Sequence, residues 1–271
     1  MSTTIEVVNL CKSYGGRPVL KGLCFQVLQG EIFALLGING AGKTTALECM
    51  EGLRRYDSGR LVVKGKTGIQ LQSASLPAYI KPMEAVRLFA GWKKAGIDDS
   101  LLAAMGLESM AKKTYASLSA GQKRRLHLVL ALMDNPDILF LDEPTAALDI
   151  EGREAFYSQI RRLKEQGKTI VLSSHDMAEV ENLCDRMAIL REGEIVFLGT
   201  AAELHAKMGG RDTICIQTPA GWEGYTADNI GDTMLRLLTD LRERSIPVLD
   251  IKIDRGGLVR DFMEIAGREE K

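Results

Sequence analysis

The chain has 271 residues, of which 45% are hydrophobic and 26% charged, enough for one large α/β domain and a small appendage. Its net charge of −1 gives no bulk electrostatic preference for nucleic acid or for an anionic membrane surface. The five cysteines are odd in number and lack a CxxC pair, which argues against a disulfide framework or a zinc site. We expect no secretory leader, and no apolar run reaches the ~18 to 20 residues of a membrane helix, so a role in transport would require a pore from another chain.

Short apolar runs broken by glycine and proline predict strands in the first part of the chain, at 5–10, 23–28, 31–36, 60–64 and 68–72. A helix over 43–53 opens directly out of a Gly-rich turn. Residues 82–134 are rich in Ala, Leu, Met, Lys and Glu, and Pro82 suits a first helical turn. We therefore expect this stretch to be mostly helical.

From residue 137 the pattern alternates between strands and helices. Continuous apolar runs at 138–141 and 169–172 are typical of strands covered on both faces, and helices are expected at 150–166 and 176–184. A hairpin is expected around Glu192-Gly193. This alternation predicts an α/β fold, with a largely parallel sheet and helices on both of its faces.

The character of the chain changes after Gly209-Gly210. The tail predicts a small α+β appendage, with strands at 213–217 and 248–253 and helices at 231–244 and 257–266. We therefore expect a main domain over 1–209 and a C-terminal extension over 210–271.

A phosphate-binding loop is predicted where residues 37–44 read GINGAGKT and fit the pattern G-x-x-x-x-G-K-[ST]. An apolar strand precedes the loop and a helix follows it, as the motif requires. Backbone N–H groups of the loop and the helix N-terminus would face a triphosphate. Lys43 is expected to reach the β- and γ-phosphates and Thr44 to bind Mg²⁺, with Thr45 as a second hydroxyl donor. The alternative is an incidental Gly-rich turn.

Two carboxylates, Asp142 and Glu143, directly follow the buried strand 138–141. Ligands of open parallel sheets bind beyond the carboxyl ends of the strands. Asp142 would hold Mg²⁺, directly or through water, and Glu143 could polarise the attacking water as a general base. The alternative is a pair of solvated acids that end a strand.

A second anion-binding surface is predicted at Leu118-Ser119-Ala120-Gly121-Gln122, directly before a helix. A serine and a glycine at a helix N-terminus favour an anion. Since the chain already has one phosphate loop, the economical ligand is the γ-phosphate of an ATP held by another copy.

Together these motifs resemble those of the ABC-transporter ATPase family, in family order over about residues 5–205. GINGAGKTT (37–45) is similar to Walker A, LSAGQ (118–122) to the signature, ILFLDEP (138–144) to Walker B and AALD (146–149) to the D-loop. The chain departs from the family at Ile38, where proline is common, and at Ala120, where glycine is usual. Its segment before Gln72 is also short, which predicts a trimmed antiparallel edge sheet.

The resemblance implies roles for further residues. Tyr14 would stack on adenine, His175 would contact the γ-phosphate, and Gln72 would sense Mg²⁺ and water, with Gln70 as a competitor for that role. Asp149 would belong to the D-loop at the dimer axis. The implied nucleotide-binding residues of the loop are Asn39, Gly40, Ala41, Gly42, Lys43, Thr44 and Thr45, and those acting from the partner copy are Ser119, Gly121 and Gln122.

The implied fold is a P-loop NTPase core with a helical signature subdomain at about 73–134. The implied function is ATP hydrolysis that powers transport, of the bacterial export type, with ATP and Mg²⁺ as cofactors. The partners would be an integral membrane permease and a second ATPase copy, in a homodimer or heterodimer at the cytoplasmic face of the membrane, and no nucleic acid.

The sequence disfavours three alternative functions. An ABC-type ATPase acting on ribosomes or DNA usually carries two nucleotide domains, coiled coils or zinc modules, which are not visible here. A P-loop kinase or GTPase is disfavoured by LSAGQ and His175 and by the lack of an NKxD motif. A purely regulatory nucleotide-binding module is disfavoured by Glu143.

Overall fold

The computed structural model describes residues 2–70, 75–146, 148–207 and 212–254, together with 262, 265 and 266. Contacts divide the chain into two compact units, Met1–Leu198 and Gly199–Lys271, which are described separately. The predicted domain boundary after residue 209 remains a prediction.

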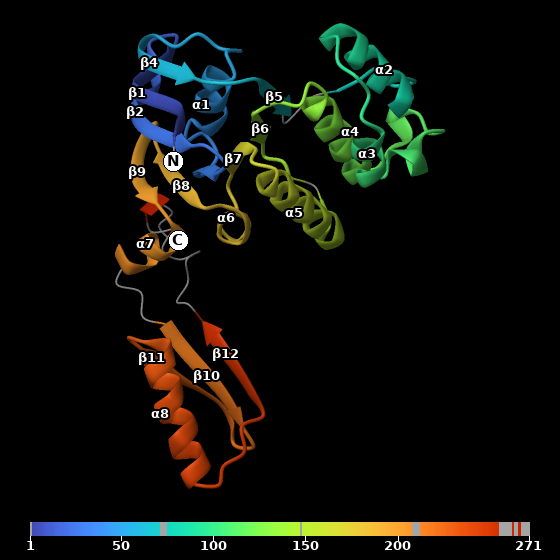
Figure 1. Cartoon of the computed structure of the whole chain (residues 1–271). Helices are drawn as coiled ribbons and strands as arrows, with labels where there is room; N and C mark the ends of the chain where they lie inside the picture. The colour runs from blue at the N-terminus through green and yellow to red at the C-terminus, as the bar shows by residue number, and fades with distance from the viewer. Residues whose placement is uncertain are drawn as a thin grey trace. The chain divides into compact units, whose positions relative to one another are not determined.

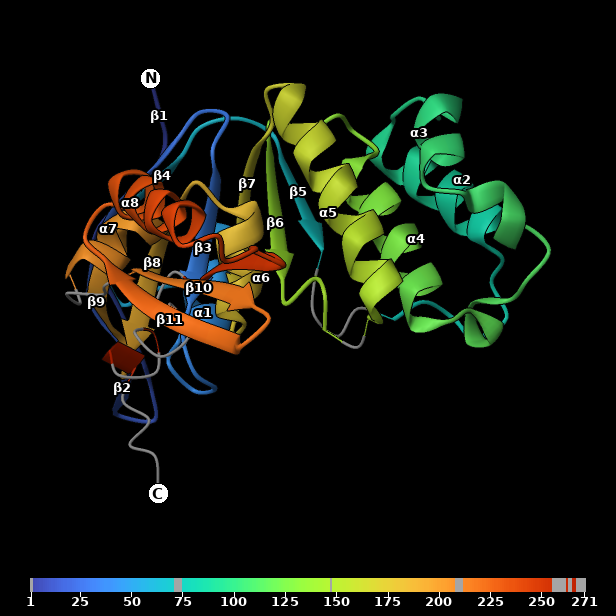
Figure 2. The same cartoon turned by 90° about the horizontal axis from the view of Figure 1, so that it is seen from below.

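A six-stranded sheet forms the centre of the first unit, in the order β5-β6-β7-β3-β8-β9 (Figure 2). Its strands are β3 (Ile32–Leu36), β5 (Thr67–Gln70), β6 (Ile138–Asp142), β7 (Thr169–Ser174), β8 (Arg186–Arg191) and β9 (Glu194–Gly199). The pairs from β5 through β8 are parallel. Every residue of β3, β6 and β7 is buried, because helices or a second sheet cover both faces. The predicted mostly parallel sheet is therefore confirmed.

A three-stranded antiparallel sheet, in the order β2-β1-β4, accompanies the central sheet. It consists of β1 (Thr3–Tyr14), β2 (Arg17–Leu28) and β4 (Ser58–Val63). Gly15 and Gly16, with φ of 55° and 81°, form the two-residue turn between β1 and β2 and place Tyr14 opposite Arg17. This is the antiparallel edge sheet that the sequence predicts.

Helix α1 (Lys43–Met50) lies between the two sheets, whereas α5 (Ile150–Glu165) and α6 (Met177–Leu183) cover the other face of the central sheet (Figure 1). The side chains between the sheets form one core, in which Phe25 of β2 stacks on Phe33 of β3 with ring centroids 5.3 Å apart. This sandwich fixes the start of α1 against the carboxyl end of β3.

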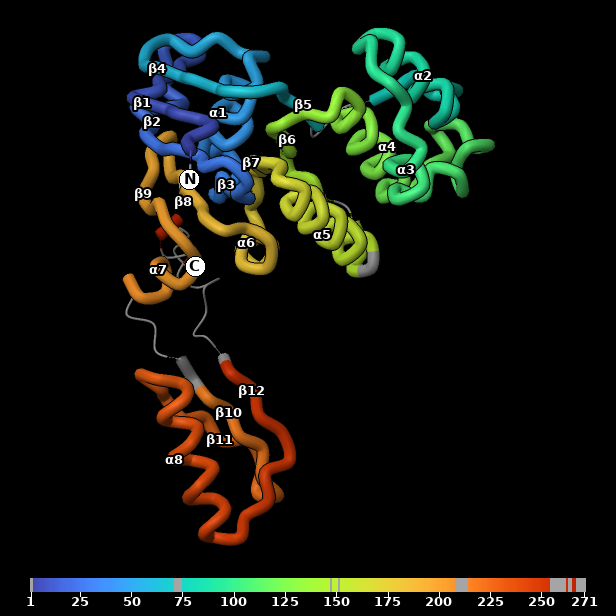
Figure 3. The backbone as a smooth tube through the Cα atoms, in the orientation of Figure 1, coloured from blue at the N-terminus to red at the C-terminus, as the bar shows by residue number. Residues whose placement is uncertain are grey.

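A group of helices is inserted between β5 and β6, as the chain trace in Figure 3 shows. It contains α2 (Pro82–Lys93), α3 (Asp99–Ala104), short 3₁₀ turns at Leu107–Met110 and Tyr115–Ser117, and α4 (Ala120–Leu132). Pro82 stands at the start of α2, where its missing N–H costs nothing. The prediction of a mostly helical stretch over 82–134 is confirmed.

The second unit contains α7 (Ala201–Lys207) and an antiparallel sheet in the order β11-β10-β12, on which α8 (Ile230–Glu243) packs. The strands are β10 (Asp212–Thr218), β11 (Gly221–Ala227) and β12 (Asp250–Asp254). The α+β appendage is confirmed, although α7 and β11 were not predicted. Two glycines in the seven residues of β11 weaken its strand pattern. Of the predicted helix 257–266, only Phe262, Ile265 and Ala266 lie among the described residues, and they are helical.

Within the described ranges, none of the helices has the length and hydropathy needed to cross a lipid bilayer.

The turn between β8 and β9 braces the phosphate loop. The N–H of Gly193 donates to the carbonyl of Ala41 at 3.1 Å, and its own carbonyl accepts from the N–H of Lys21 at 2.8 Å. Gly193 has a φ of 84°, and a Cβ added there would lie 2.2 Å from the Val19 carbonyl oxygen. Glycine is therefore required on two counts, backbone conformation and space.

We predict that Gly193→Ala lowers the free energy of unfolding by about 2–5 kcal/mol, the sum of left-handed strain and crowding. Gly167→Ala is the matched control, because Gly167 has a φ of 81° but open space around its Cα. That change should cost only the strain, about 1–2 kcal/mol. Urea unfolding followed by circular dichroism measures both, and equal losses in the two variants would contradict the bracing role.

Candidate functional site

The phosphate loop connects the buried end of β3 to the first turn of α1. Gly42 is the N-cap of α1 with a φ of 104°, and an added Cβ would lie 2.9 Å from Leu20 Cδ2. Gly37 has no room for a side chain, since a Cβ there would lie 2.6 Å from the carbonyl oxygen of Leu190. Close packing against β2 and β8 therefore fixes the loop and leaves the N–H groups of the first turn of α1 without helical partners.

An open hollow of ≈ 990 Å³ lies over this loop. It brings together most of the predicted nucleotide-binding residues, and Ala41 is the exception because its side chain is buried in the core. The predicted residues that line the hollow are Tyr14, Asn39, Gly40, Gly42, Lys43, Thr44, Thr45 and Glu143. Its size and its mixture of an aromatic ring, a cation and loop backbone suit a nucleoside triphosphate.

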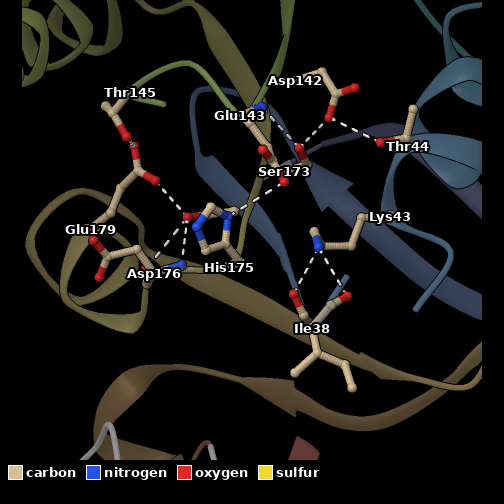
Figure 4. Close-up of polar contacts among 12 residues, drawn as sticks. Ile38, Lys43, Thr44, Asp142, Glu143, Thr145, Ser173, His175, Asp176 and Glu179 are labelled. Carbon is tan, nitrogen blue, oxygen red and sulfur yellow. Dashed lines mark hydrogen bonds and ion pairs between the residues drawn. The ribbon is translucent and has the colours of Figure 1, made fainter. Parts of the chain in front are cut away.

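Lys43 is 5% exposed, and its Nζ donates to the carbonyl oxygens of Gly37 at 2.7 Å and Ile38 at 3.1 Å (Figure 4). Burial lowers the pKa of its ammonium group, while the charges of Glu143 and Asp142 act in the opposite direction. A cation so placed has few competing water contacts and is available to an anion in the loop.

Ser173 of β7 links the two predicted carboxylate residues, as Figure 4 shows. Its hydroxyl donates to Asp142 Oδ1 and accepts from the backbone N–H of Glu143 at 3.0 Å. The hydroxyl of Thr44, on α1, lies 3.4 Å from the same Oδ1 of Asp142. Asp142 and Ser173 are strand partners in the parallel register of β6 and β7, so the sheet itself creates this contact.

Glu143 has a left-handed backbone, with a φ of 44°, which is uncommon for a residue other than glycine. Its carboxylate Oε1 lies 3.4 Å from Nδ1 of His175, which follows β7. The Glu143 side chain is 15% exposed and that of His175 is 55% exposed. The carboxylate is therefore shielded but reachable, and the imidazole lies at the open side of it.

The oxygen donors present fit a magnesium ion. Hydroxyl and carboxylate oxygens are the ligands that Mg²⁺ prefers, and Thr44 Oγ1 and Asp142 Oδ1 already face each other at 3.4 Å. The described residues contain no cluster of three His, Cys, Asp or Glu side chains. One carboxylate with one hydroxyl matches a Mg²⁺ ion whose remaining ligands come from phosphate and water.

A buried carboxylate, Glu179 of α6, ties the loop after Glu143 to the end of β7. Its oxygens accept from the hydroxyls of Thr145 at 2.9 Å and Ser174 at 2.5 Å. Burial raises the pKa of Glu179, and the two hydroxyl donors oppose that shift. The sequence analysis did not single out Glu179, Thr145 or Ser173. Two serines at the end of the otherwise apolar strand 169–174 could have indicated a polar contact there.

The signature residues lie in a different hollow, of ≈ 510 Å³, between α4 and the start of α5. Ser119 is the N-cap of α4, and it exchanges hydrogen bonds with Gln122 in a capping box. Asp149 caps α5 by accepting from the N–H of Gly152 at 2.8 Å. Among the described residues, none lines both this hollow and the one over the phosphate loop. One chain therefore keeps its signature apart from its phosphate loop.

Gln72, predicted for the Q-loop, lies outside the described residues. Its competitor Gln70, the last residue of β5, is 1% exposed, and neither polar atom of its side chain has a described hydrogen-bond partner. Gln72 therefore remains the predicted Q-loop glutamine, with Gln70 as its competitor.

Comparison with known proteins places these motifs in a family context. Residues 20–146 match the family model described as ABC transporter. The chain is 34% identical to the linearmycin resistance ATP-binding protein LnrL of Bacillus subtilis, over 92% of this chain and 84% of that protein. It is 33% identical to the daunorubicin resistance ATP-binding protein DrrA3 of Streptomyces coeruleorubidus, over 97% and 89% of the two chains. It is 37% identical to the Nod factor export ATP-binding protein I of Paraburkholderia xenovorans, over 79% and 77%.

Solved structures agree with the fold. An ATP-binding subunit of an ABC transporter superposes with a TM-score of 0.68 at 27% identity, over 76% of this chain and 93% of that one. The ADP conformation of MJ1267, an ATP-binding cassette of an ABC transporter, gives a TM-score of 0.68 at 20% identity, over 75% and 93%. The latter supports the fold alone.

Glu51, at the C-terminal end of α1, gives a pH-dependent prediction. Both of its carboxylate oxygens are buried without a described hydrogen-bond partner, and burial, followed by the charges of Asp142 and Glu48, raises its pKa from 4.5 to about 8. Between these two values the folded protein holds a proton that the unfolded chain releases. The stability of the folded state should therefore fall as the pH rises from about 5 to about 8.

We predict that Glu51→Gln raises the melting temperature at about pH 8 more than at about pH 5, because the amide never has to be charged. The exposed Glu108→Gln is the control and should show no such gain. Thermal unfolding at the two pH values measures the effect. An identical pH dependence of wild type and Glu51→Gln would show that Glu51 is not protonated in the fold.

Proposed function

We propose, from the premise that this chain belongs to the ATP-binding subunits of ABC transporters, that it closes as a dimer around two ATP molecules and powers export through a separate membrane subunit. ATP hydrolysis that powers transport is the activity of this family, and dimer closure and export are the proposal. The observation that carries it is the separation of the phosphate-loop hollow from the signature hollow within one chain. Each chain then holds two half-sites, and only a second copy completes them.

In the phosphate-loop half-site, backbone N–H groups of the loop and Lys43 hold the phosphates, and Tyr14 stacks on the adenine. Tyr14 is 40% exposed at the end of β1 and lines the same hollow as the loop. The carbonyl contacts that hold Lys43 at the loop, 2.7 and 3.1 Å long, leave its ammonium group within reach of a β- or γ-phosphate.

Thr44 and Asp142 would hold Mg²⁺, which neutralises phosphate charge when bound. Ser173 keeps Asp142 oriented by donating to the carboxylate oxygen that faces Thr44. The direct partner of the ion is then the hydroxyl of Thr44, with Asp142 acting directly or through water. Gln72, whose role the family resemblance suggests, lies outside the described residues.

Glu143 would accept a proton from the attacking water, and His175, 3.4 Å from it, would contact the γ-phosphate. Ser119 and Gly121 of the partner copy would complete the site from the other side, with Gln122 holding the Ser119 turn and Asp149 holding the start of α5 at the dimer axis. Charge neutralisation and alignment are the main requirements for phosphoryl transfer to water.

The names of the relatives support export, because LnrL and DrrA3 are resistance proteins and the Nod factor protein is an export protein. In such an export system a permease partner would form the transport pathway, since the relatives are named as ATP-binding proteins of resistance and export systems. We place the dimer on the cytoplasmic face of the membrane, where ATP is available.

We predict that Glu143→Gln binds ATP with wild-type affinity but lowers kcat by about 10²–10⁴-fold, since the amide cannot accept the proton. Glu154→Gln, on the exposed surface of α5, is the control and should retain normal turnover. Phosphate release and equilibrium binding of a fluorescent ATP analogue measure the two quantities. Normal turnover in Glu143→Gln would remove Glu143 from the role of general base.

Lys43→Ala should weaken ATP binding by at least about a hundredfold, because several charge-assisted hydrogen bonds are lost. Lys64→Ala, with the same loss of charge at an exposed position after β4, is the control. Equilibrium binding of the same ATP analogue measures both. Unchanged ATP affinity in Lys43→Ala would overturn the assignment of the phosphate loop.

Dimer closure is tested in the Glu143→Gln background, where ATP should persist. We predict that this variant elutes as a dimer with Mg-ATP and that adding Ser119→Glu returns it to a monomer, because the new carboxylate would repel the facing γ-phosphate. Ser109→Glu is the control, since Ser109 is exposed and its hydroxyl donates to the carbonyl oxygen of Gly106 within its own turn. Size-exclusion chromatography with light scattering measures the oligomeric state. A dimer that persists in the Ser119→Glu variant would contradict the proposal that Ser119 faces the γ-phosphate held by the partner copy.

A further inference from the structure

The signature helix α4 contacts Glu143, the residue directly after β6 of its own chain, through Arg124, which follows Ser119 by five residues. Nη2 of Arg124 donates to the backbone carbonyl oxygen of Glu143 at 3.1 Å. Burial lowers the pKa of the guanidinium, while the charges of Asp142 and Glu143 oppose that shift. A half-buried cation is costly unless it is hydrogen-bonded, and the Glu143 carbonyl oxygen supplies such a partner.

The contact falls on a residue of the site whose backbone is strained. Glu143 has a φ of 44°, a left-handed conformation that is strained for a residue other than glycine. Its N–H is held by Ser173 Oγ at 3.0 Å, and its carbonyl oxygen accepts from Arg124 and from the N–H of Ala146 at 3.2 Å. β7 therefore supplies the contact to the N–H, and α4 supplies the charged contact to the carbonyl. Loss of the charged donor would weaken the hold on this peptide and on the direction of the Glu143 side chain that it carries.

We propose that Arg124 is a positioning residue that sets the Glu143 carboxylate of its own chain, so that α4 serves both active sites of the dimer at once. The N-terminus of α4 faces the nucleotide held by the partner, while Arg124 orients the general base of the site on its own chain. A displacement of α4 at one site is thereby transmitted to the carboxylate of the other. This inference rests on the proposed function, in which Glu143 is the general base and the signature acts on the partner's ATP.

The neighbouring Arg125 provides the matched control. Its Nη1 donates to the Met105 carbonyl oxygen at 3.4 Å, which lies within the helical subdomain. Arg125→Met removes the same charge from the same helix and leaves the link from α4 to Glu143 intact. Arg124→Lys provides the rescue, because an ammonium group retains a donor for the carbonyl of Glu143.

The experiment uses mixed dimers of the full chain, purified through two different tags. One chain carries Glu143→Gln, so the only active site contains the Glu143 of the second chain and the signature of the first. Arg124→Met is then placed on either chain. On the chain with the intact Glu143, it should lower kcat at least about tenfold, with KM for ATP unchanged within about twofold. On the Glu143→Gln chain, kcat should stay within about twofold of the parent dimer.

Arg124→Lys on the intact chain should recover most of the lost kcat, and Arg125→Met should leave it within about twofold. A loss confined to the Glu143→Gln chain would mean that Arg124 acts through the signature, and equal losses on both chains would mean that it supports the helix as a whole. Either result, or no loss at all, overturns the proposal. The proposed function fails separately, if dimers with Glu143→Gln on both chains still hydrolyse ATP at the wild-type rate.

Discussion

The register of three buried parallel strands decides where the chemistry of this protein lies. Leu36 of β3 pairs with Ser174 of β7, and Asp142 of β6 pairs with Ser173, so the three strands end at one edge of the sheet. The phosphate loop follows the end of β3, the acidic pair stands at the end of β6, and His175 follows the end of β7. A shift of one residue in any pairing would turn the polar side chains toward the opposite face. Such a shift is costly, because both faces of these strands are covered and the polar residues at their ends would be moved into apolar packing.

Charged groups gather at the carboxyl ends of these strands, and a protein interior tolerates them only when each has hydrogen-bond partners. Lys43 and Asp142 are each at most 5% exposed, and Glu179 is 2% exposed. None is isolated. Lys43 donates to two carbonyl oxygens, and the carboxylates of Asp142 and Glu179 each accept from two hydroxyl groups. These hydrogen bonds offset desolvation and fix the geometry before substrate arrives, which is the arrangement that electrostatic catalysis requires.

The sequence predicted the elements and residues whose signals are local. A strand, a Gly-rich loop and a helix in succession identify Lys43 and Thr44, and an apolar run ended by two acids identifies Asp142 and Glu143. Ser173 and Arg124 could not be found in this way, since their partners lie thirty and nineteen residues distant in the chain and meet only through folding. The strand β11 was missed for a different reason. Its two glycines weaken the local strand signal, and the strand forms because it pairs with β10 along its whole length. The short segment before Gln72 predicted a trimmed antiparallel edge sheet, and the described sheet has three strands, β1 and β2 of one hairpin together with β4.

The insertion of the helical subdomain between two adjacent strands has a mechanical consequence. The chain leaves the sheet after Gln70, at the carboxyl end of β5, and re-enters it at Ile138, at the amino end of β6. Because Thr67 pairs with Ile138 and Gln70 with Leu141, the two attachments lie about 10 Å apart along one border of the sheet. The attachments lie on the two strands at one edge of the sheet, at opposite ends of the ladder that joins these strands. A rotation of the subdomain about the line through these two points would leave the ladder between β5 and β6 intact.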